Sequence, residues 1–201
     1  MLPPTGQWTC LVVEDDSDET VWTAVLRGEA DELGIIWDRH RDRVFRHLLG
    51  RGAHAADAED LTAMTFLELW RRRESVQVVD GSLLPWLLAT ATNVGRNAAR
   101  SRRRYQAVLA RLPAPADEPD LAQTLLPPEV AGERVLRRQW HQLRLVDQQL
   151  LVLTAVEGFR VAEAAAALGL TEAAAKMRLS RLRRRLRVAV ANSKALEGEP
   201  A

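Results

Sequence analysis

Polar side chains that could bind nucleic acid recur along one segment of the chain, residues 85–104. Two asparagines and two arginines stand there at intervals of three and four residues: Asn93, Arg96, Asn97 and Arg100. On a helix this spacing places all four side chains on one face. Carboxamides hydrogen-bond to base edges, and guanidiniums bind both base edges and phosphates. The segment alone fits a DNA-contacting helix or a solvated amphipathic helix equally well, so the rest of the chain has to decide between them.

A second basic segment lies near the end of the chain. Its pattern predicts a short alanine-rich helix at residues 161–168, a glycine turn at 169–171 and a longer helix at 172–188. Two helices joined by a glycine turn, with positive charge on the second, are typical of a helix-turn-helix, and a plain helical hairpin with a charged face is the alternative. Upstream, Asp147 is expected to cap a helix that ends at Gly158. The side chains that could contact bases or phosphates are Thr171, Glu172, Lys176, Arg178, Ser180, Arg181 and Arg184.

The elements that position these side chains are predicted to be helices. Only 5% of the 201 residues are aromatic, and alanine and leucine are plentiful, which favours an all-α protein packed on small and aliphatic side chains. Residues 106–131 contain five prolines and several acidic residues, as expected of an extended linker. We therefore predict two small helical domains, at residues 29–105 and 132–190, and a tail at 191–201.

The first predicted domain contains two helices and then a loop, which is followed by residues 85–104. One helix covers residues 29–49, and Asp57 is expected to cap the next. Phe66 and Trp70 form a stripe on that second helix that fits either the core or a partner-binding face. Residues 74–84 lose the helical pattern and are predicted to form a loop. The residues of the second helix expected to face inward are Leu61, Met64, Thr65 and Leu69.

The composition excludes several classes of function. The formal net charge is +1, but acidic residues gather near the start and arginines near the end, an asymmetry that points to nucleic acid. Cys10 is the only cysteine, which excludes an intramolecular disulfide and a cysteine zinc site. His40, His47 and His54 lack companions at metal-ligand spacing, and no nucleophile and base form a cluster, so we expect neither a cofactor nor an enzyme. No run of about 18 apolar residues and no signal-peptide pattern occurs, which predicts a cytoplasmic protein.

Residues 1–28 show no regular pattern. The run LVVEDD at residues 11–16 resembles the first strand and acidic pair of a response-regulator receiver domain. A receiver domain would need about 120 residues of alternating strand and helix, whereas the pattern is helical from Ile35 onward and the first lysine is Lys176. We therefore interpret the run as a chance resemblance and predict that residues 1–28 form a mostly disordered acidic extension.

Together these segments resemble the sigma factors of bacterial RNA polymerase, of the small two-domain extracytoplasmic-function type. The resemblance covers most of the chain after Glu29 and rests on motifs in a fixed order. These are DAEDLTAMTFLELWRR at residues 57–72, PWLLATATNVGRNAARSRRR at 85–104, and the pair DQQLLVLTAVEGFRVAEAAAALGLT and EAAAKMRLSRLRRRLR within 147–187. The family implies an all-α fold, with a region 2 bundle before the proline-rich linker and a region 4 helix-turn-helix after it.

The resemblance implies a protein that binds core RNA polymerase, directs it to promoter DNA and helps melt the −10 element. Residues 57–70 resemble the helix that binds the coiled coil of the β′ clamp, and the implied contacts are Asp57, Glu59, Asp60, Phe66 and Trp70. The loop at residues 76–82 and the helix after it resemble the parts that capture a flipped base and read the −10 element. The residues implied there are Val78, Asp80, Ser82, Asn93, Arg96, Asn97, Arg100 and Arg103.

The family also implies roles for the second domain. Its helix-turn-helix would read the −35 element, through Thr171, Glu172, Lys176, Arg178, Ser180, Arg181 and Arg184. The apolar surface around Leu150 and Leu153 resembles the part that packs on the β flap of the polymerase. An anti-sigma factor is a further implied partner, and it could hold the two domains closed across a flexible linker.

Some residues depart from the family pattern. Ala63 and Met64 stand where Gln-Glu is usual, which removes an acidic partner for the clamp, and Arg96 and Asn97 stand where an apolar residue and an aspartate are more common. The alternative function is that of a helix-turn-helix transcriptional regulator that acts without joining core polymerase. The block at residues 57–104 argues against it, because such a regulator does not need an acidic clamp-binding helix followed by a face of asparagines and arginines.

Overall fold

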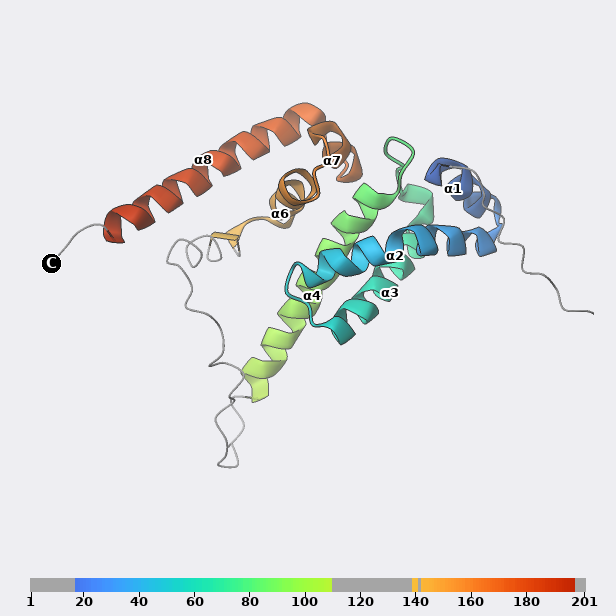
Figure 1. Cartoon of the computed structure of the whole chain (residues 1–201), viewed down its shortest axis with the longest axis horizontal. Coiled ribbons are helices and arrows are strands. Elements are labelled where there is room, and N and C mark those ends of the chain that lie inside the picture. Colours follow the sequence, from blue (N-terminus) through green and yellow to red (C-terminus); the bar gives the residue numbers. More distant parts are fainter. Residues whose placement is uncertain (1–16, 110–138, 141, 198–201) are drawn as a thin grey trace, which may run out of the picture.

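The structure, a computed structural model, describes residues 17–109, 139–140 and 142–197, with side chains described as far as residue 191. Apart from an isolated bridge between Val79 and Ser82, the regular structure of this part of the chain is helical, which confirms the all-α prediction (Figure 1). Its α-helices are α1 (Asp18–Arg27), α2 (Leu33–Leu49), α3 (Ala55–Arg71), α4 (Leu84–Leu109), α6 (Leu145–Leu151), α7 (Val161–Ala167) and α8 (Glu172–Glu197). Shorter helical turns are η1 (Ala30–Glu32), η2 (Arg73–Ser75) and η4 (Val152–Val156).

The prediction that residues 1–28 form a disordered extension is wrong for the second half of that segment. α1 is a helix of 10 residues whose Val21, Trp22 and Val25 lie in the hydrophobic core. It ends at Gly28, whose φ of 107° is in the left-handed region that favours glycine. A helix of fewer than three turns shows too few repeats for its apolar spacing to be recognised from sequence. The earlier part of the predicted extension lies outside the described residues.

Helices α1 to α4 pack around one core. α2 contacts α1, α3 and α4, and α3 also contacts α4. α2 and α4 approach closely at Gly95, where a Cβ atom would lie 3.3 Å from Cδ2 of Leu48. Glycine lowers helix propensity, but here the missing side chain allows this close packing. The largest side chains that become fully buried in this core are Ile36, Leu48, Leu69, Leu83, Leu87 and Leu88.

The buried face of α3 differs from the predicted one at Met64, and it includes Phe66, for which the sequence left the core and a partner-binding face as alternatives. Met64 was expected to face inward, but it is 52% exposed. Phe66 lies in the core, only 5% exposed, with its ring packed edge-on against Trp37 at a centroid distance of 4.7 Å. Because α3 packs against both α2 and α4, its buried face is wide enough to include Phe66. Leu61, Thr65 and Leu69 are buried as predicted.

Two predicted helix caps are also wrong. α3 begins at Ala55 with His54 in the N-cap position, and α6 begins after Arg144. Asp57 and Asp147 therefore lie inside the first turns of these helices. An acidic side chain in the first turn still interacts favourably with the helix dipole. The two residues thus stabilise the predicted helix ends through their charge and not as N-caps.

The second half of the chain has the predicted helix-turn-helix. Gly158, with a φ of 80°, connects η4 to the segment before α7, and Gly169, with a φ of 65°, forms the turn between α7 and α8. α7 and α8 pack through small buried residues such as Ala164 and Ala175, which allow the two helices to cross closely. α8 continues to Glu197, past residue 190, where we had placed the end of the domain.

The two halves of the chain lie against each other. We call residues 17–109 the N-module and the described residues from 139 onward the C-module. α4 of the N-module contacts α6, η4 and α7 of the C-module, and buried residues of both modules join one hydrophobic cluster (Figure 1). α4 also extends to Leu109, so the predicted linker begins later than residue 106; residues 110–131 of that prediction lie outside the described part.

Candidate nucleic-acid interface

The predicted DNA-contacting residues of α4 lie along the second half of this helix. Asn93 and Arg96 are half-buried, whereas Asn97, Arg100 and Arg103 are exposed. The helical spacing therefore gives one accessible cationic face, as predicted from the sequence. The carboxamide oxygen of Asn93 is buried and has no hydrogen-bond partner among the described residues. An unpaired buried acceptor is costly, so this side chain is suited to an incoming donor.

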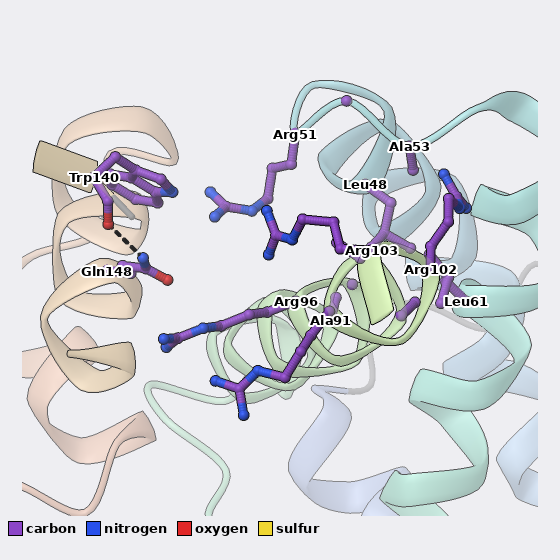
Figure 2. A pocket seen from close by; sticks show the side chains of 15 residues that line it. Leu48, Arg51, Ala53, Leu61, Ala91, Arg96, Arg102, Arg103, Trp140 and Gln148 are labelled. Carbon is purple, nitrogen blue, oxygen red and sulfur yellow. Dashed lines mark hydrogen bonds between the residues drawn. The ribbon is translucent and has the colours of Figure 1, made fainter. Parts of the chain in front are cut away.

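Several arginines surround a pocket beside this face (Figure 2). Arg51 points from the α2–α3 loop toward Trp140 of the C-module, and its guanidinium lies 5.0 Å from the centroid of the indole ring. Burial lowers the pKa of Arg51, and the charge of Glu157 opposes this effect. Gln148 donates a hydrogen bond of 2.7 Å to the carbonyl oxygen of Trp140. The arginines that line the pocket are Arg51, Arg96, Arg100, Arg102 and Arg103, so its lining is strongly positive.

The loop before α4 is tightly folded. Val79 and Ser82 exchange backbone hydrogen bonds of 2.9 and 3.0 Å. The two residues between them have positive φ, 49° at Asp80 and 74° at Gly81. This is the turn geometry that favours Asp, Asn and Gly, and it brings the two ends of the loop side by side. Val78 is half-buried and Asp80 is exposed.

Asp18, at the start of α1, holds this loop. Its carboxylate accepts hydrogen bonds from the backbone N–H of Leu83 at 2.8 Å and from the hydroxyl of Ser82 at 3.2 Å. It also accepts from Nε2 of His40 at 2.6 Å and from the guanidinium of Arg39 at 3.2 Å. The residue is only 4% exposed. Burial by itself raises the pKa of Asp18, but the hydrogen bonds from His40 and Leu83 outweigh it and bring the pKa to about 2.

Sequence reasoning missed Asp18 because it assigned this segment to a disordered tail. Ser82, predicted as a DNA contact, instead uses its hydroxyl within the loop: the hydroxyl donates to Asp18 and accepts from the N–H of Leu84 at 3.1 Å. Asp80 is engaged by Arg160 of the C-module, with which it forms an ion pair. Figure 1 shows the loop between α1 and α7. The structure therefore ties one end of the loop to α1 and its tip to the C-module.

The acidic face predicted on α3 is only partly accessible. Glu59 and Asp60 are exposed, but Asp57 forms an ion pair of 2.5 Å with Arg102 of α4. Phe66 is in the core, so it cannot be part of an exposed contact surface in this conformation. Trp70 is half-buried beneath the guanidinium of Arg73, which lies 4.6 Å from the centroid of its ring.

The outer stripe of α3 joins Asp60, an implied polymerase contact, to two residues that were not among the implied contacts, Met64 and Leu67. Asp60, Met64 and Leu67 are exposed and follow one another at intervals of four and three residues, so they lie on the same side of the helix. Leu67 is 47% exposed, and together with Met64 it forms an apolar surface next to the acidic residues. The alternation of buried and exposed residues along α3 could have identified Leu67 only if the buried face had been placed correctly.

Some polar and basic residues of the helix-turn-helix are exposed, and others are held by structural partners. Lys176, Ser180 and Arg184 are exposed and line a groove on α8 that also includes Arg183 and Arg187. Those last two arginines belong to the basic part of this helix that the sequence pattern predicts to bind phosphates. Arg181 is exposed too, and one of its guanidinium nitrogens donates to the Sδ atom of Met177 at 3.1 Å.

The remaining predicted residues of the helix-turn-helix have structural partners. Arg178 forms an ion pair of 3.1 Å with Asp147 of α6, which fixes α8 against the rest of the module. The hydroxyl of Thr171 accepts the backbone N–H of Ala174 at 3.2 Å and so caps α8. Glu172 pairs with Lys176 one turn further along, at 2.7 Å. Ser180, Arg183, Arg184 and Arg187 of the groove are exposed and can therefore reach a phosphate backbone, whereas Arg178 is held by Asp147.

Two segments of the chain match models of known protein families. Residues 36–105 match the family model for sigma-70 region 2, and residues 134–186 match the one for sigma-70 region 4. The chain is 31% identical over 164 residues to RNA polymerase sigma factor CarQ of Myxococcus xanthus, a match that covers 80% of this chain and 90% of CarQ. It is 29% identical over 183 residues to ECF RNA polymerase sigma factor SigE of Mycolicibacterium smegmatis, which covers 86% of this chain and 69% of SigE.

A solved structure has a similar fold. CnrH, determined in complex with the cytosolic domain of CnrY, superposes with a TM-score of 0.53 at 23% identity, covering 88% of this chain and 99% of that chain. In the described part of this chain, none of the helices has the length and apolar character needed to cross a bilayer. Sigma factors are regulatory subunits and not catalysts. On these matches the chain belongs to the extracytoplasmic-function group of the sigma-70 factors of RNA polymerase.

Proposed function

We propose that this sigma factor joins core RNA polymerase in the cytoplasm, directs it to promoters with a −10 and a −35 element, and helps to open the DNA at −10. The observation that carries the proposal is the order of two features along the chain: a tight loop at residues 79–83 directly precedes α4, and the second half of α4 carries a cationic face. A tight loop can accept an unstacked base, and a row of arginines can follow the sugar-phosphate backbone of the released strand. We propose residues 17–109 and 139–190 as the two functional units.

Within the −10 surface, each group of residues has a proposed task. Val78 and Asp80 lie at the loop where a flipped base would be held, and Asn93 and Asn97 could hydrogen-bond to base edges. Arg96, Arg100 and Arg103 would bind phosphates, which position the DNA without reading its sequence. Flipping a base costs a few kcal/mol, so a rigid loop and a track of fixed positive charge are both needed to stabilise the opened strand.

We infer that Asp18 is a positioning residue for this surface. It does not reach the DNA itself, but it fixes the loop through the N–H of Leu83 and the hydroxyl of Ser82. Asp18→Asn keeps the size of the side chain but lacks the charge that attracts Arg39 and His40. It should therefore change the ratio of transcription from promoters that differ in one −10 base, while a purely structural role would lower transcription from all of them equally.

For the polymerase contact, we propose the exposed stripe of α3 as the surface that binds the β′ clamp. Glu59 and Asp60 supply the charge, while Met64 and Leu67 supply apolar area that polymerase contact would bury. Trp70 is at the edge of this stripe. Because Met64 stands in place of the usual acidic residue, we expect the interface to depend more on apolar contact and less on salt than in related proteins.

For the C-module, we propose that the groove of α8 binds the −35 element. Lys176, Ser180 and Arg184 are exposed there, and Arg183 and Arg187 extend the same positive surface. An anti-sigma factor that holds the two modules together is a further prediction from the family.

The experiment that tests this proposal is open-complex formation on a promoter library, with purified core polymerase in the presence or absence of the full chain. We expect transcripts that start at a shared pair of elements only when the chain is present. A variant with Arg96→Ala and Arg100→Ala should bind core polymerase normally but open few promoters. Binding of the chain to duplex DNA without any binding to core polymerase would contradict the proposal and favour the helix-turn-helix regulator.

A further inference from the structure

A buried carboxylate connects the two modules. Glu157, in the turn after η4, accepts a hydrogen bond of 2.7 Å from Nδ1 of His47 and one of 2.6 Å from the guanidinium of Arg43. Only 8% of the Glu157 side chain and 1% of the His47 side chain are exposed. His47 is also within 3.0 Å of the hydroxyl of Thr92 on α4. A charge so far removed from water needs this set of partners, so Glu157 is built into the interface between the modules.

Other polar contacts also join the two modules. Gln149 of α6 reaches into the N-module and donates a hydrogen bond of 2.8 Å to the carbonyl oxygen of Ala89 in α4. Arg160 pairs with Asp80 at the tip of the −10 loop. These contacts lie on elements that the N-module would need for promoter opening. In the conformation described, the C-module therefore occupies part of the proposed DNA surface.

The spacing of promoter elements shows that this conformation cannot be the one that acts on DNA. The names of the elements place their centres about 25 base pairs apart, which at about 3.4 Å per base pair is about 85 Å along the duplex. In the structure, a residue that directly precedes α7 of the helix-turn-helix is bonded to the −10 loop. Two sites in direct contact cannot bind elements separated by such a distance. The modules must come apart before both elements can be bound.

The proposed flap surface is also buried in this conformation. Leu150 and Leu153 are at most 1% exposed, and both belong to the hydrophobic cluster shared by the modules. Any partner that uses this surface has to reach residues that are now covered. Interfaces between domains of one chain are often polar and reversible, and the contacts of Glu157, Gln149 and Arg160 fit that description.

We propose that the structure is a closed, self-inhibited form of this sigma factor, and that Glu157 is the central residue of the latch. The inference rests on the proposed function, because it uses the positions of the −10 and −35 surfaces. The latch is electrostatic: Glu157 neutralises a cluster of positive residues at the end of α2, where Arg43, Arg46 and Arg51 border the same cavity. When the modules separate, this cluster becomes available to another anion, and the phosphate backbone of DNA is the chemically matching one.

The test is a distance measurement on the full chain. Spin labels on cysteines introduced at two exposed positions by Glu74→Cys and Ala173→Cys, in a Cys10→Ser background, report the separation of the modules by pulsed electron spin resonance. We expect one short, narrow distance for the otherwise unchanged chain. Glu157→Ala should convert most of it into a broad distribution at longer distance. Glu68→Gln, which removes an ion-paired carboxylate inside the N-module, is the matched control and should leave the short distance unchanged.

A charge exchange distinguishes a latch from general damage to the fold. Arg43→Glu alone should open the modules, and Arg43→Glu combined with Glu157→Arg should restore a part of the short distance. Circular dichroism has to show the same helix content for every variant. A broad distribution in the unchanged chain, or a short distance that survives Glu157→Ala, would overturn the proposal.

A second readout uses DNA. If only the open fraction binds, the apparent affinity for forked promoter DNA rises as that fraction rises, so Glu157→Ala should bind about fivefold more tightly than the unchanged chain. An equal affinity despite open modules would overturn the claim that closure inhibits DNA binding. The distance readout needs no polymerase, so a failure of the latch can be told apart from a failure of the proposed sigma function.

Discussion

Two buried carboxylates in this protein bind the same helix through the same types of side chain. They differ in whether the contact lies within one module or between the two modules. Asp18 pairs with Arg39 and His40, and Glu157 pairs with Arg43 and His47, so each binds one arginine and one histidine of α2. Asp18 belongs to the module that contains α2, whereas Glu157 is contributed by the other module. One ion cluster is therefore part of a folding unit, and the other is a contact between two units.

The remaining partners of the two carboxylates explain this difference. Asp18 also accepts a backbone N–H and a hydroxyl from the loop at residues 82–83, which cannot leave without unfolding the loop. Glu157 has side-chain partners, and these can turn toward water when the modules separate. The comparison suggests that the type of donor, more than the depth of burial, decides whether a buried charge is a permanent or a releasable part of a structure.

The largest effect is expected from Asp18→Ala. This change leaves the N–H of Leu83 and the ring of His40 buried without their acceptor, which should lower the free energy of unfolding by about 3 kcal/mol. Urea unfolding followed by circular dichroism measures it. Glu19→Ala, at an exposed neighbour in the same helix, is the control and should change the stability by less than about 0.5 kcal/mol. If both variants lower the free energy of unfolding by a similar amount, the contacts of Asp18 do not stabilise the protein more than those of an exposed residue.

A smaller effect is expected from Glu157→Ala under the same conditions. Opening of the modules lets Arg43 and His47 regain water, so the loss should be about 1 kcal/mol. The same urea titration gives the value. If Glu157→Ala destabilises the protein as much as Asp18→Ala does, the contact between the modules is as permanent as the one within the N-module, and the comparison fails.

The pH dependence of stability should report on His47. Burial lowers the pKa of His47 below its usual 6.5, only partly opposed by Glu157, while the charges of Arg51 and Arg43 lower it further. The unfolded chain therefore binds a proton at this site more readily than the folded chain. Stability should fall by up to about 1 kcal/mol as the pH is lowered from about 7 to about 5.5. Thermal unfolding should show a shallower pH dependence for His47→Gln, and an unchanged dependence would contradict this assignment.

The smallest effect on stability is expected from deletion of residues 1–16. The contacts described for α1 begin at Ser17 and Asp18, so the free energy of unfolding should change by less than about 0.5 kcal/mol. The deletion removes the acidic run Glu14–Asp15–Asp16, and DNA affinity at low salt should therefore rise. Deletion of residues 1–28 takes away Asp18 and the buried Trp22 as well and should destabilise the protein at least as much as Asp18→Ala does.

The helical periodicity of the sequence was enough to predict the all-α class, the helices around Phe66, Asn93 and Leu179, and the turn at Gly169. Each of these depends on contacts between near neighbours, which the sequence displays directly. The rotation of α3 was harder to predict, since packing against two helices decides that Phe66 is buried and Met64 exposed. The predicted DNA-contacting residues themselves stay a prediction.

Contacts between distant parts of the chain could not be predicted. Nothing near Glu157 in the sequence shows that its partner, His47, lies 110 residues away. Asp18 was missed for a related reason: its partners lie at Ser82 and Leu83, and only the folded loop brings them to the start of α1. Both carboxylates look like ordinary surface residues until the tertiary structure is known.

The arrangement of α2 links these two sites mechanically. His40 and His47 are seven residues apart, which is close to two helical turns and about 10 Å along the axis. They therefore lie on nearly the same side of one stiff helix, with the loop at residues 79–83 attached through Asp18 near His40 and the C-module attached through Glu157 near His47. A tilt of this helix would displace both attachments together. A single-residue insertion in α2 between them would rotate one site by about 100° relative to the other, so the length of this segment should be as constrained in evolution as the residues it carries.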